Sequence, residues 1–233
     1  MMHIKLLNIM WCYDREAEQV KVILEHDAAW QLPKTNLGQA ESGTEAILRL
    51  TEQVTGQVLD ADHVEQLTTL SHPTLVHAGE REVILVYMTY LPFYPTLDTT
   101  VHKLFTLRTS NSKYQLYRGE VAFSLTSIAD ETKYHEVNKT SPLVYEYALQ
   151  YACRYIKRSL EQMPLILKIL GESFTLREAR SVYASFLQIK INQLDNSNFK
   201  KTHRKILVEV GQVVKKSPGR PARLYRLKDE VQF

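Results

Sequence analysis

The 233-residue chain has little of what defines several protein classes. Its two cysteines, Cys12 and Cys153, are too few for a disulfide framework. No apolar run approaches the roughly 20 residues that cross a bilayer. The short apolar stretch at the N-terminus is followed at once by charged residues, so no signal peptide is evident. These absences predict a cytoplasmic protein with no membrane partner.

Motifs of the common enzyme classes are also missing. The sequence has no G-x-S-x-G elbow, Walker loop, Cys-x-x-Cys pair or dinucleotide-binding glycine fingerprint. Its eight histidines show no spacing typical of a metal site. Hydrophobic residues make up 44% of the chain, an ordinary share for a globular protein. The sequence therefore predicts a globular protein with no catalytic residue, bound metal or cofactor.

What the sequence does contain is an uneven distribution of charge. Ten Lys or Arg residues lie between Asn196 and Lys228, where Glu209 is the only acidic residue, so this segment carries +9. The remaining chain carries −6, because the net charge is +3. Such asymmetry indicates a polyanion partner for the basic segment. The alternative is a solvated basic face that only keeps the protein soluble.

Two helices are predicted before and within this basic segment. Thr175 and Glu178 form a capping box that predicts a helix through residue 187. Asp195 is expected to cap a second helix over residues 197–207, with Phe199, Ile206 and Leu207 on its buried side. The expected buried face of the first helix consists of Leu176, Ala179, Val182, Tyr183 and Phe186.

A basic hairpin is predicted after the helices. Strands expected at residues 208–214 and 224–227 flank a loop at 215–223 that is rich in Lys, Arg, Pro and Gly. Two helices and a hairpin are typical of a winged helix-turn-helix domain, whose second helix enters the major groove of double-stranded DNA. Arg and Asn suit base edges, and Lys suits phosphates. The expected DNA-binding residues are Asn198, Lys200, Lys201, His203, Arg204, Lys205, Lys216, Arg220 and Arg223.

Two other interpretations of the loop remain open. Gly219–Arg220–Pro221 is similar to the core of an AT-hook, although Pro218 stands where that motif has its first arginine. The basic residues could also form a nuclear-localisation signal, which would leave the predicted helices unexplained.

The first part of the chain predicts strands and one helix. Alternating or apolar β-rich runs predict strands at residues 4–13, 20–26, 63–70 and 82–91, with a loop at 30–38. Ser42 and Glu45 form a capping box for a helix that ends at Gly56. Residues 92–112 have no clear pattern. Ser141 and Pro142 are expected to start a helix that runs to about residue 162, which divides the chain into domains at 1–162 and 163–233.

The predicted helix at 42–56 carries part of a known motif. Trp30–Pro33 followed by Glu41, Arg49 and Gly56 resembles the Nudix box. Thr35 replaces its glycine, while Leu50, Gln53 and Val54 replace glutamates that hold Mg²⁺ or Mn²⁺ in a Nudix hydrolase. Hydrolysis is therefore not expected. The alternative is a Nudix-type hydrolase of a nucleoside diphosphate derivative, with Glu41, Glu45 and Glu52 as an altered site and the basic segment as a nucleic-acid-binding tail.

In the order of its features, the chain resembles the Nudix-related transcriptional regulators, best known as regulators of NAD metabolism. The matching segments include Glu65–Leu67, Phe174–Glu178, Asn198–Lys200 and Pro218–Tyr225. The resemblance implies an α+β protein, with a Nudix-like mixed β-sheet/α sandwich followed by a winged helix-turn-helix domain. It also implies a homodimeric, repressor-like regulator of a roughly palindromic operator, controlled by a small-molecule effector, either ADP-ribose-like or a sugar.

The same resemblance indicates which residues bind the effector. These are Trp30, Lys34, Glu41, Arg49 and Arg81. Lys34 and Thr35 stand where the family has paired glycines close to a phosphate, which weakens the case for ADP-ribose. Glu41 and Arg49 could instead pair and brace the loop, Trp30 could cover the core, and Arg81 could be a surface charge. A degenerate scaffold that serves only protein interactions is a further alternative.

Overall fold

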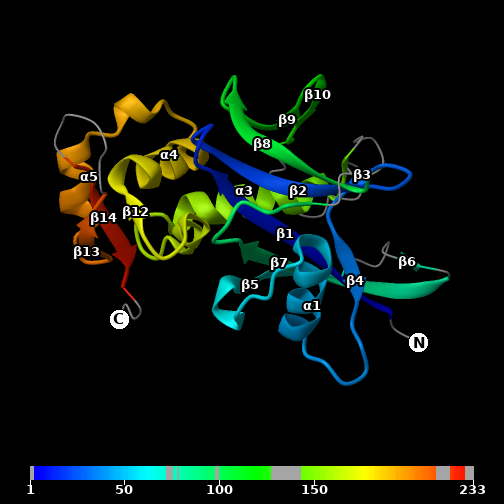
Figure 1. The fold of residues 1–233 in the computed structure, drawn as a ribbon. Coiled ribbons are helices and arrows are strands. Elements are labelled where there is room, and N and C mark those ends of the chain that lie inside the picture. Colours follow the sequence, from blue (N-terminus) through cyan, green and yellow to red (C-terminus); the bar gives the residue numbers. More distant parts are fainter. Residues whose placement is uncertain are drawn as a thin grey trace.

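The computed structural model describes residues 3–71, 76–77, 79–97, 100–126, 143–213 and 221–228. Figure 1 shows a large sheet with helices on both faces and a smaller helical and β unit at one end. The α-helices are α1 (Gly43–Thr55), α3 (Glu146–Ser159), α4 (Leu176–Leu187) and α5 (Asn196–Thr202), and the 3-10 helices are η1 (Ala61–His63), η3 (Leu165–Leu170) and η4 (Ile191–Gln193). The strands are β1 (His3–Asp14), β2 (Gln19–His26), β3 (Trp30–Gln31), β4 (Lys34–Asn36), β5 (Val64–Leu70), β6 (Val76–His77), β7 (Glu80–Tyr90), β8 (His102–Ser110), β9 (Lys113–Arg118), β10 (Val121–Ser124), β11 (Leu143–Val144), β12 (Phe174–Thr175), β13 (Leu207–Gln212) and β14 (Arg223–Leu227).

The large sheet is mixed, with the strand order β10-β9-β8-β2-β1-β7-β5. Its centre is the parallel pair of β1 and β7, and β2 and β5 run antiparallel to them on either side. Successive side chains of a strand point to opposite faces. Because β1 is buried almost throughout, helices must cover both of its faces.

The alternation of β1 divides the core into two layers. Leu7, Ile9 and Trp11 pack in one cluster with α3 and α4, whereas Leu6 and Met10 pack in another cluster with α1. Figure 1 shows the same division, with α1 in front of the sheet and α3 behind it. The expected α+β sandwich is therefore confirmed.

Local sequence determines both ends of α1. The Ser42 side chain accepts the Glu45 N–H, and the Glu45 carboxylate accepts the Ser42 N–H, which completes the predicted capping box. Gly56 ends the helix with a φ of 69°, a left-handed conformation that favours glycine. A buried chain of hydrogen bonds from Thr89 through Asn8 to Thr51 joins α1 to the two central strands.

Gly43 allows the first turn of α1 to lie against the sheet. A Cβ atom at this position would stand 2.1 Å from the hydroxyl oxygen of Tyr87, whose ring is buried. We expect Gly43→Ala to lower the free energy of unfolding by about 1–3 kcal/mol, the usual cost of overpacking. Urea denaturation measures this loss. Tyr87→Phe removes the obstructing oxygen, so the double variant Gly43→Ala/Tyr87→Phe should recover part of the stability. If the double variant loses as much stability as Gly43→Ala alone, the clash with the Tyr87 hydroxyl is not the cause.

Several predicted boundaries are wrong in the first domain. Residues 30–38, expected as a loop, contain the short strands β3 and β4, and residues 92–112, where no element was expected, contain all of β8. The helix expected from Ser141 is also wrong in its start, since α3 begins after Tyr145, which has a φ of 65°. Ser141 and Pro142 lie outside the described residues. The helix starts later because Leu143 and Val144 first pair as β11 with β3.

The smaller unit contains the two predicted helices and a three-stranded sheet. The Thr175–Glu178 capping box opens α4, and all five residues of its predicted core face are buried. Asp195 caps α5 as expected, but α5 ends at Thr202, earlier than predicted. The hairpin strands β13 and β14 form a three-stranded sheet with β12, an unexpected strand that pairs with β14. Helices and hairpin together form a winged helix domain. In the parts of the chain described, no helix is long and apolar enough to cross a membrane.

The winged helix domain packs directly on the large sheet. The ring of Phe186, on α4, meets the ring of Trp11, on β1, edge to face with centroids 5.5 Å apart. The Tyr114 hydroxyl on β9 donates to the Phe186 carbonyl. One continuous apolar cluster includes Trp11, Tyr114 and Phe186, so the hydrophobic core does not stop at the boundary expected near residue 163. The division at 162/163 stays a prediction.

Candidate functional site

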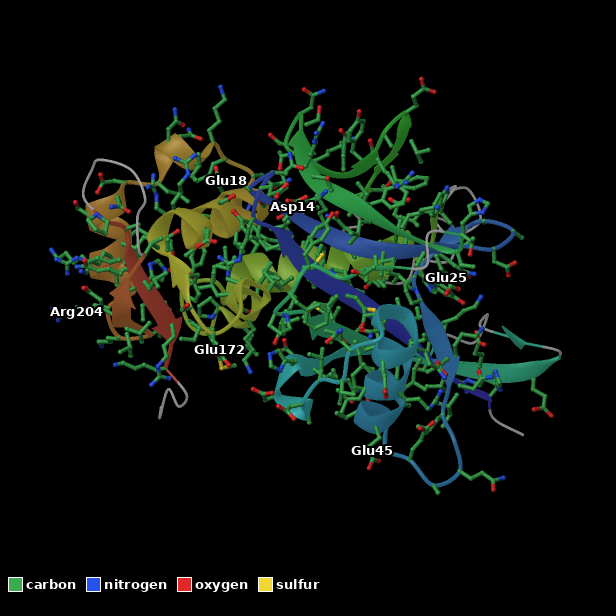
Figure 2. All side chains as sticks on the ribbon, in the orientation of Figure 1. Asp14, Glu18, Glu25, Glu45, Glu172 and Arg204 are labelled. Carbon is green, nitrogen blue, oxygen red and sulfur yellow. The ribbon has the colours of Figure 1, made fainter. Side chains whose placement is uncertain are left out.

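The short helix α5 presents its charged side chains to solvent. Lys200 and Lys201 of α5 are exposed, as are Arg204 and Lys205 of the turn that follows it, and these four residues form a cationic face. Phe199 is buried against Tyr183 of α4, with ring centroids 4.8 Å apart. Figure 2 shows Arg204 pointing away from the rest of the molecule at this end. Buried Phe199 fixes the orientation of the helix, and the exposed cations are placed where a polyanion could bind them. Lys216 and Arg220 lie outside the described residues.

The hairpin strand β13 supplies one carboxylate to this cationic face. Glu209 accepts two hydrogen bonds of 2.8 Å from Arg223 and one of 3.3 Å from Lys200. The Lys200 ammonium also lies 5.4 Å from the centre of the Tyr225 ring. Hydrogen bonding from Arg223, with a smaller contribution from Lys200, lowers the pKa of Glu209. Glu209 therefore stays ionised, and its single negative charge offsets part of the charge of two expected DNA-binding cations, Arg223 and Lys200.

We expect Glu209→Gln to tighten DNA binding about two- to fivefold in low salt, because it removes a negative charge beside expected phosphate contacts. The difference should shrink at high salt, where exposed charges are screened. Fluorescence anisotropy at two salt concentrations measures both effects. Glu172→Gln removes an exposed carboxylate elsewhere and serves as the control. Weaker binding of the Glu209 variant would show that the carboxylate positions Arg223 rather than opposing DNA.

His203 is a correction to the predicted DNA-binding set. Its side chain is 5% exposed and lies between the rings of Tyr183 and Phe199, with centroid distances of 4.9 Å and 4.2 Å. Its Nδ1 atom lies 2.8 Å from the carbonyl oxygen of Phe199. Burial lowers the pKa of this imidazole, so it is neutral at pH 7. A buried, neutral ring cannot contact a phosphate or a base from this position.

Arg177 and Arg180 of α4 are two candidate residues that the sequence analysis missed. They line an open groove of about 780 Å³ together with Lys200 and Arg223. In helix-turn-helix domains the first helix crosses the DNA backbone. The groove therefore extends the cationic face from α5 towards the start of α4. The sequence signal was their spacing, since residues 177 and 180 fall on one side of a helix.

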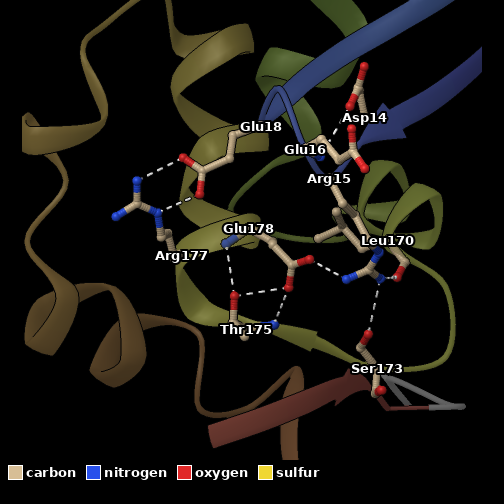
Figure 3. Close-up of polar contacts among 9 residues, drawn as sticks. All are labelled: Asp14, Arg15, Glu16, Glu18, Leu170, Ser173, Thr175, Arg177 and Glu178. Atoms are coloured by element: carbon tan, nitrogen blue, oxygen red, sulfur yellow. Dashed lines mark hydrogen bonds and ion pairs between the residues drawn. The ribbon is translucent and has the colours of Figure 1, made fainter. Parts of the chain in front are cut away.

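The start of α4 is held by the turn between β1 and β2. Figure 3 shows Arg177 bound through two nitrogens to Glu18, with distances of 2.6 Å and 2.8 Å. Arg15, on the same turn, binds the Glu178 carboxylate and the Leu170 carbonyl. The Ser181 hydroxyl donates to the Glu18 carbonyl at 2.8 Å. Residues of the turn thus bind an arginine that faces the cationic groove.

The degenerate Nudix motif lies on α1 and the loop before it. Glu41 and Arg49 form two hydrogen bonds, of 2.6 Å and 3.0 Å, and Arg49 also donates to Thr35 and to the carbonyl of Asn36. Hydrogen bonding from Arg49, and then from the Gly38 N–H, lowers the pKa of Glu41. This pair braces the loop, one of the two predicted roles; contact with a ligand stays a prediction.

Aliphatic side chains occupy the metal-binding positions of the motif. Leu50 and Val54 are each 6% exposed and belong to the core between α1 and the sheet. Glu45 is already engaged in the capping box. Among the described residues, no group of three or more His, Cys, Asp or Glu side chains could hold a metal ion. The helix is thus built for packing at the positions where a Nudix hydrolase needs carboxylates.

The other three expected effector residues each contact different partners. Trp30 is half-buried between the rings of His26 and Phe105, with centroid distances of 4.6 Å and 4.9 Å. Lys34 donates to Gln31 at 2.7 Å. Arg81, at the exposed end of β7, donates to the Ser71 carbonyl at 3.0 Å. Trp30 therefore contributes to the core, and a ligand role for all three stays a prediction.

The protein thus combines an α+β sandwich, which carries the degenerate Nudix motif on α1, with a winged helix domain that has a cationic face. Comparison with known proteins agrees. Residues 166–227 match the family model of the NrtR DNA-binding winged helix domain. No curated protein sequence gives a match.

Solved structures extend this similarity over the whole chain. A MutT/nudix family protein from Enterococcus faecalis shares 26% identity, with a TM-score of 0.83 over 98% of this chain and 88% of its own. NrtR from Shewanella oneidensis shares 21% identity, with a TM-score of 0.65 over 97% and 94% of the two chains. The same protein in complex with a 27mer DNA gives 18% identity and a TM-score of 0.64, over 97% of this chain and 93% of its own. The resemblance to Nudix-related transcriptional regulators is confirmed, and residues 166–227 form a winged helix domain similar to the DNA-binding domain of NrtR.

Proposed function

We propose that the protein is a ligand-responsive transcriptional regulator that binds operator DNA as a homodimer. The observation that carries the proposal is the exposed cationic face of α5, which extends into the groove lined by Arg177, Arg180 and Arg223. The Shewanella oneidensis NrtR chain, which has the same fold, has been crystallised with a 27mer DNA. An isologous dimer would bind two half-sites, as helix-turn-helix dimers do.

The Nudix-like domain is proposed to sense a small metabolite without hydrolysing it. Leu50 and Val54 place carbon where metal-binding carboxylates are needed, and Glu41 and Glu45 already accept other hydrogen bonds. The effector is proposed to be an ADP-ribose-like nucleotide or a sugar, bound near Trp30, Lys34, Glu41, Arg49 and Arg81. A ligand changes DNA affinity only by binding the DNA-competent and DNA-incompetent states differently.

Fluorescence anisotropy on DNA from upstream of the gene, with and without ADP-ribose, tests the proposal. We expect saturable, salt-sensitive binding, because the cationic face releases counterions from DNA. A change in DNA affinity on adding ADP-ribose identifies the effector class. If ADP-ribose leaves the DNA affinity unchanged, sugars are the effectors to test next. Absence of specific DNA binding would refute the regulator, and a monomer without DNA affinity would favour a protein-interaction module.

A separate assay addresses hydrolysis. We expect no Mg²⁺- or Mn²⁺-dependent hydrolysis of ADP-ribose, because the metal-binding glutamates of the motif are replaced. Turnover that requires the metal and disappears in Glu45→Gln would instead establish the hydrolase with a basic nucleic-acid-binding tail. Because Glu45 also caps α1, circular dichroism must show that the Glu45→Gln variant keeps its helix content before a loss of turnover is assigned to the site.

A further inference from the structure

A cavity of about 430 Å³ lies on the side of α5 that faces the rest of the protein. It is lined by residues of α3 and the turn after it, of α4, and of α5 with its preceding loop. Its volume falls in the range of small-molecule sites and far exceeds that of a single water molecule. It lies apart from the Nudix motif, since no residue of α1 or of the loop before it lines the cavity.

One residue of the lining, His203, has a buried hydrogen-bonding atom without a partner. The Nε2 atom of His203 has no hydrogen-bond partner in the described parts of the chain, although the side chain is only 5% exposed. Nδ1 lies 2.8 Å from the Phe199 carbonyl, which can only accept a hydrogen bond, so Nδ1 carries the proton. Nε2 of this tautomer is an acceptor. A buried acceptor without a partner calls for a donor in the cavity.

The remaining lining residues indicate what kind of molecule brings that donor. Lys157 and Arg158 are balanced by Glu161 and Asp195, so with neutral His203 the lining has no net charge. The side chains of Asn198 and Thr202 can both donate and accept hydrogen bonds. Leu160 and Leu194 add an apolar wall. Such a lining suits a neutral molecule that carries several hydroxyl groups and an apolar face.

We propose that this cavity is a second ligand site, which binds a neutral polyhydroxylated molecule of the sugar or polyol class with one hydroxyl donating to His203 Nε2. Because α3 belongs to the first predicted domain and α5 to the second, a ligand here would touch both domains at once. The proposal does not depend on DNA binding or on a ligand of the Nudix motif.

Nitrogen NMR of the histidine side chains tests the site on the full chain without DNA or ADP-ribose. The probes are ribitol, D-glucose and maltose, each titrated to millimolar concentration, and His203→Phe identifies the His203 signals by their loss. We expect at least one probe to shift the Nε2 resonance of His203 saturably, as a new hydrogen bond to the lone pair requires. If none of the three does so, or if inorganic phosphate alone does, the polyol site is refuted.

Variants of the lining residues distinguish binding of the probe in the cavity from binding elsewhere that alters the His203 signal indirectly. Thr202→Val keeps the shape of the side chain but removes its hydroxyl, and Glu161→Ala removes a carboxylate from the cavity. We expect each substitution to lower the affinity for the probe about tenfold, the usual loss for a hydrogen bond worth about 1.4 kcal/mol. Glu120→Ala removes an exposed carboxylate outside the cavity and should leave the titration unchanged. Equal affinity in all four proteins would place the probe elsewhere and overturn the assignment.

Discussion

Replacing Lys201, Arg204 and Lys205 with alanine should weaken operator binding about 10²- to 10³-fold for each half-site near 0.1 M salt. Each phosphate contact releases condensed counterions and contributes about −0.9 to the slope of log K against log salt. Each half-site loses three contacts, so the slope should become about 2.7 less negative for each protomer and about 5.4 less negative for the dimer. The three side chains are exposed around α5, whose buried residue is Phe199, so the triple substitution leaves the helix packing unchanged. Anisotropy titrations at several salt concentrations measure both quantities.

The control for this triple variant must change the net charge equally at another place. Arg108, Lys113 and Arg118 lie on the exposed β8–β9 hairpin of the Nudix-like domain, away from the cationic face. Their replacement with alanine should alter the affinity by less than about threefold, because non-contacting charges are screened beyond a Debye length. If both triple variants weaken binding equally, the effect comes from net charge and the cationic face of α5 is not the contact surface.

The elements that could be predicted from the sequence are those whose signals are local. A capping box needs only four residues, and the boxes at Ser42 and Thr175 correctly predicted α1 and α4. The buried face of α4 followed from spacing alone. The strands β1, β2, β5 and β7 followed from apolar runs, which a sheet covered on both faces requires.

The elements that were missed depend on weaker or distant signals. β8 and β9 are joined by Asn111 and Ser112, which have φ values of 50° and 59°. Both central residues of such a tight hairpin turn need a positive φ, and Asn-Gly is its recognisable form, so Asn-Ser hides the turn. The late start of α3 depends on pairing between β11 and β3, more than a hundred residues apart. No local pattern can report that contact.

In the candidate site, too, the features that depend on local sequence were predicted and those that depend on distant contacts were missed. The Glu41–Arg49 pair was one of two predicted outcomes because their spacing within the motif brings opposite charges together. The burial of His203 could not be predicted from a run of exposed basic residues. It results from contact with Tyr183, twenty residues earlier in the chain, and only the packing of α4 on α5 establishes that contact. Arg177 was missed because its partner Glu18 lies in the other domain.

Phe186→Ala should lower the free energy of unfolding by about 3–5 kcal/mol, the usual cost of truncating a buried phenylalanine. Phe186 is fully buried, and its ring meets Trp11 at an angle of 80°, so the substitution leaves a cavity between α4 and the central strand. Because this contact joins the winged helix domain to the Nudix-like domain, we expect a single unfolding transition in the unsubstituted protein and two in the variant. Urea denaturation followed by tryptophan fluorescence and by far-ultraviolet circular dichroism reports both results.

Two comparisons separate the loss of the domain contact from a general loss of stability. Phe186→Leu keeps most of the apolar volume and should cost less than about 1.5 kcal/mol while preserving the single transition. Val58→Ala, at a side chain that is 77% exposed, should change stability by no more than about 0.5 kcal/mol. If the unsubstituted protein already unfolds in two transitions and Phe186→Ala shifts only one of them, the domains are energetically independent. The continuous core across Trp11, Tyr114 and Phe186 predicts the opposite, because neither domain can unfold without exposing apolar surface of the other.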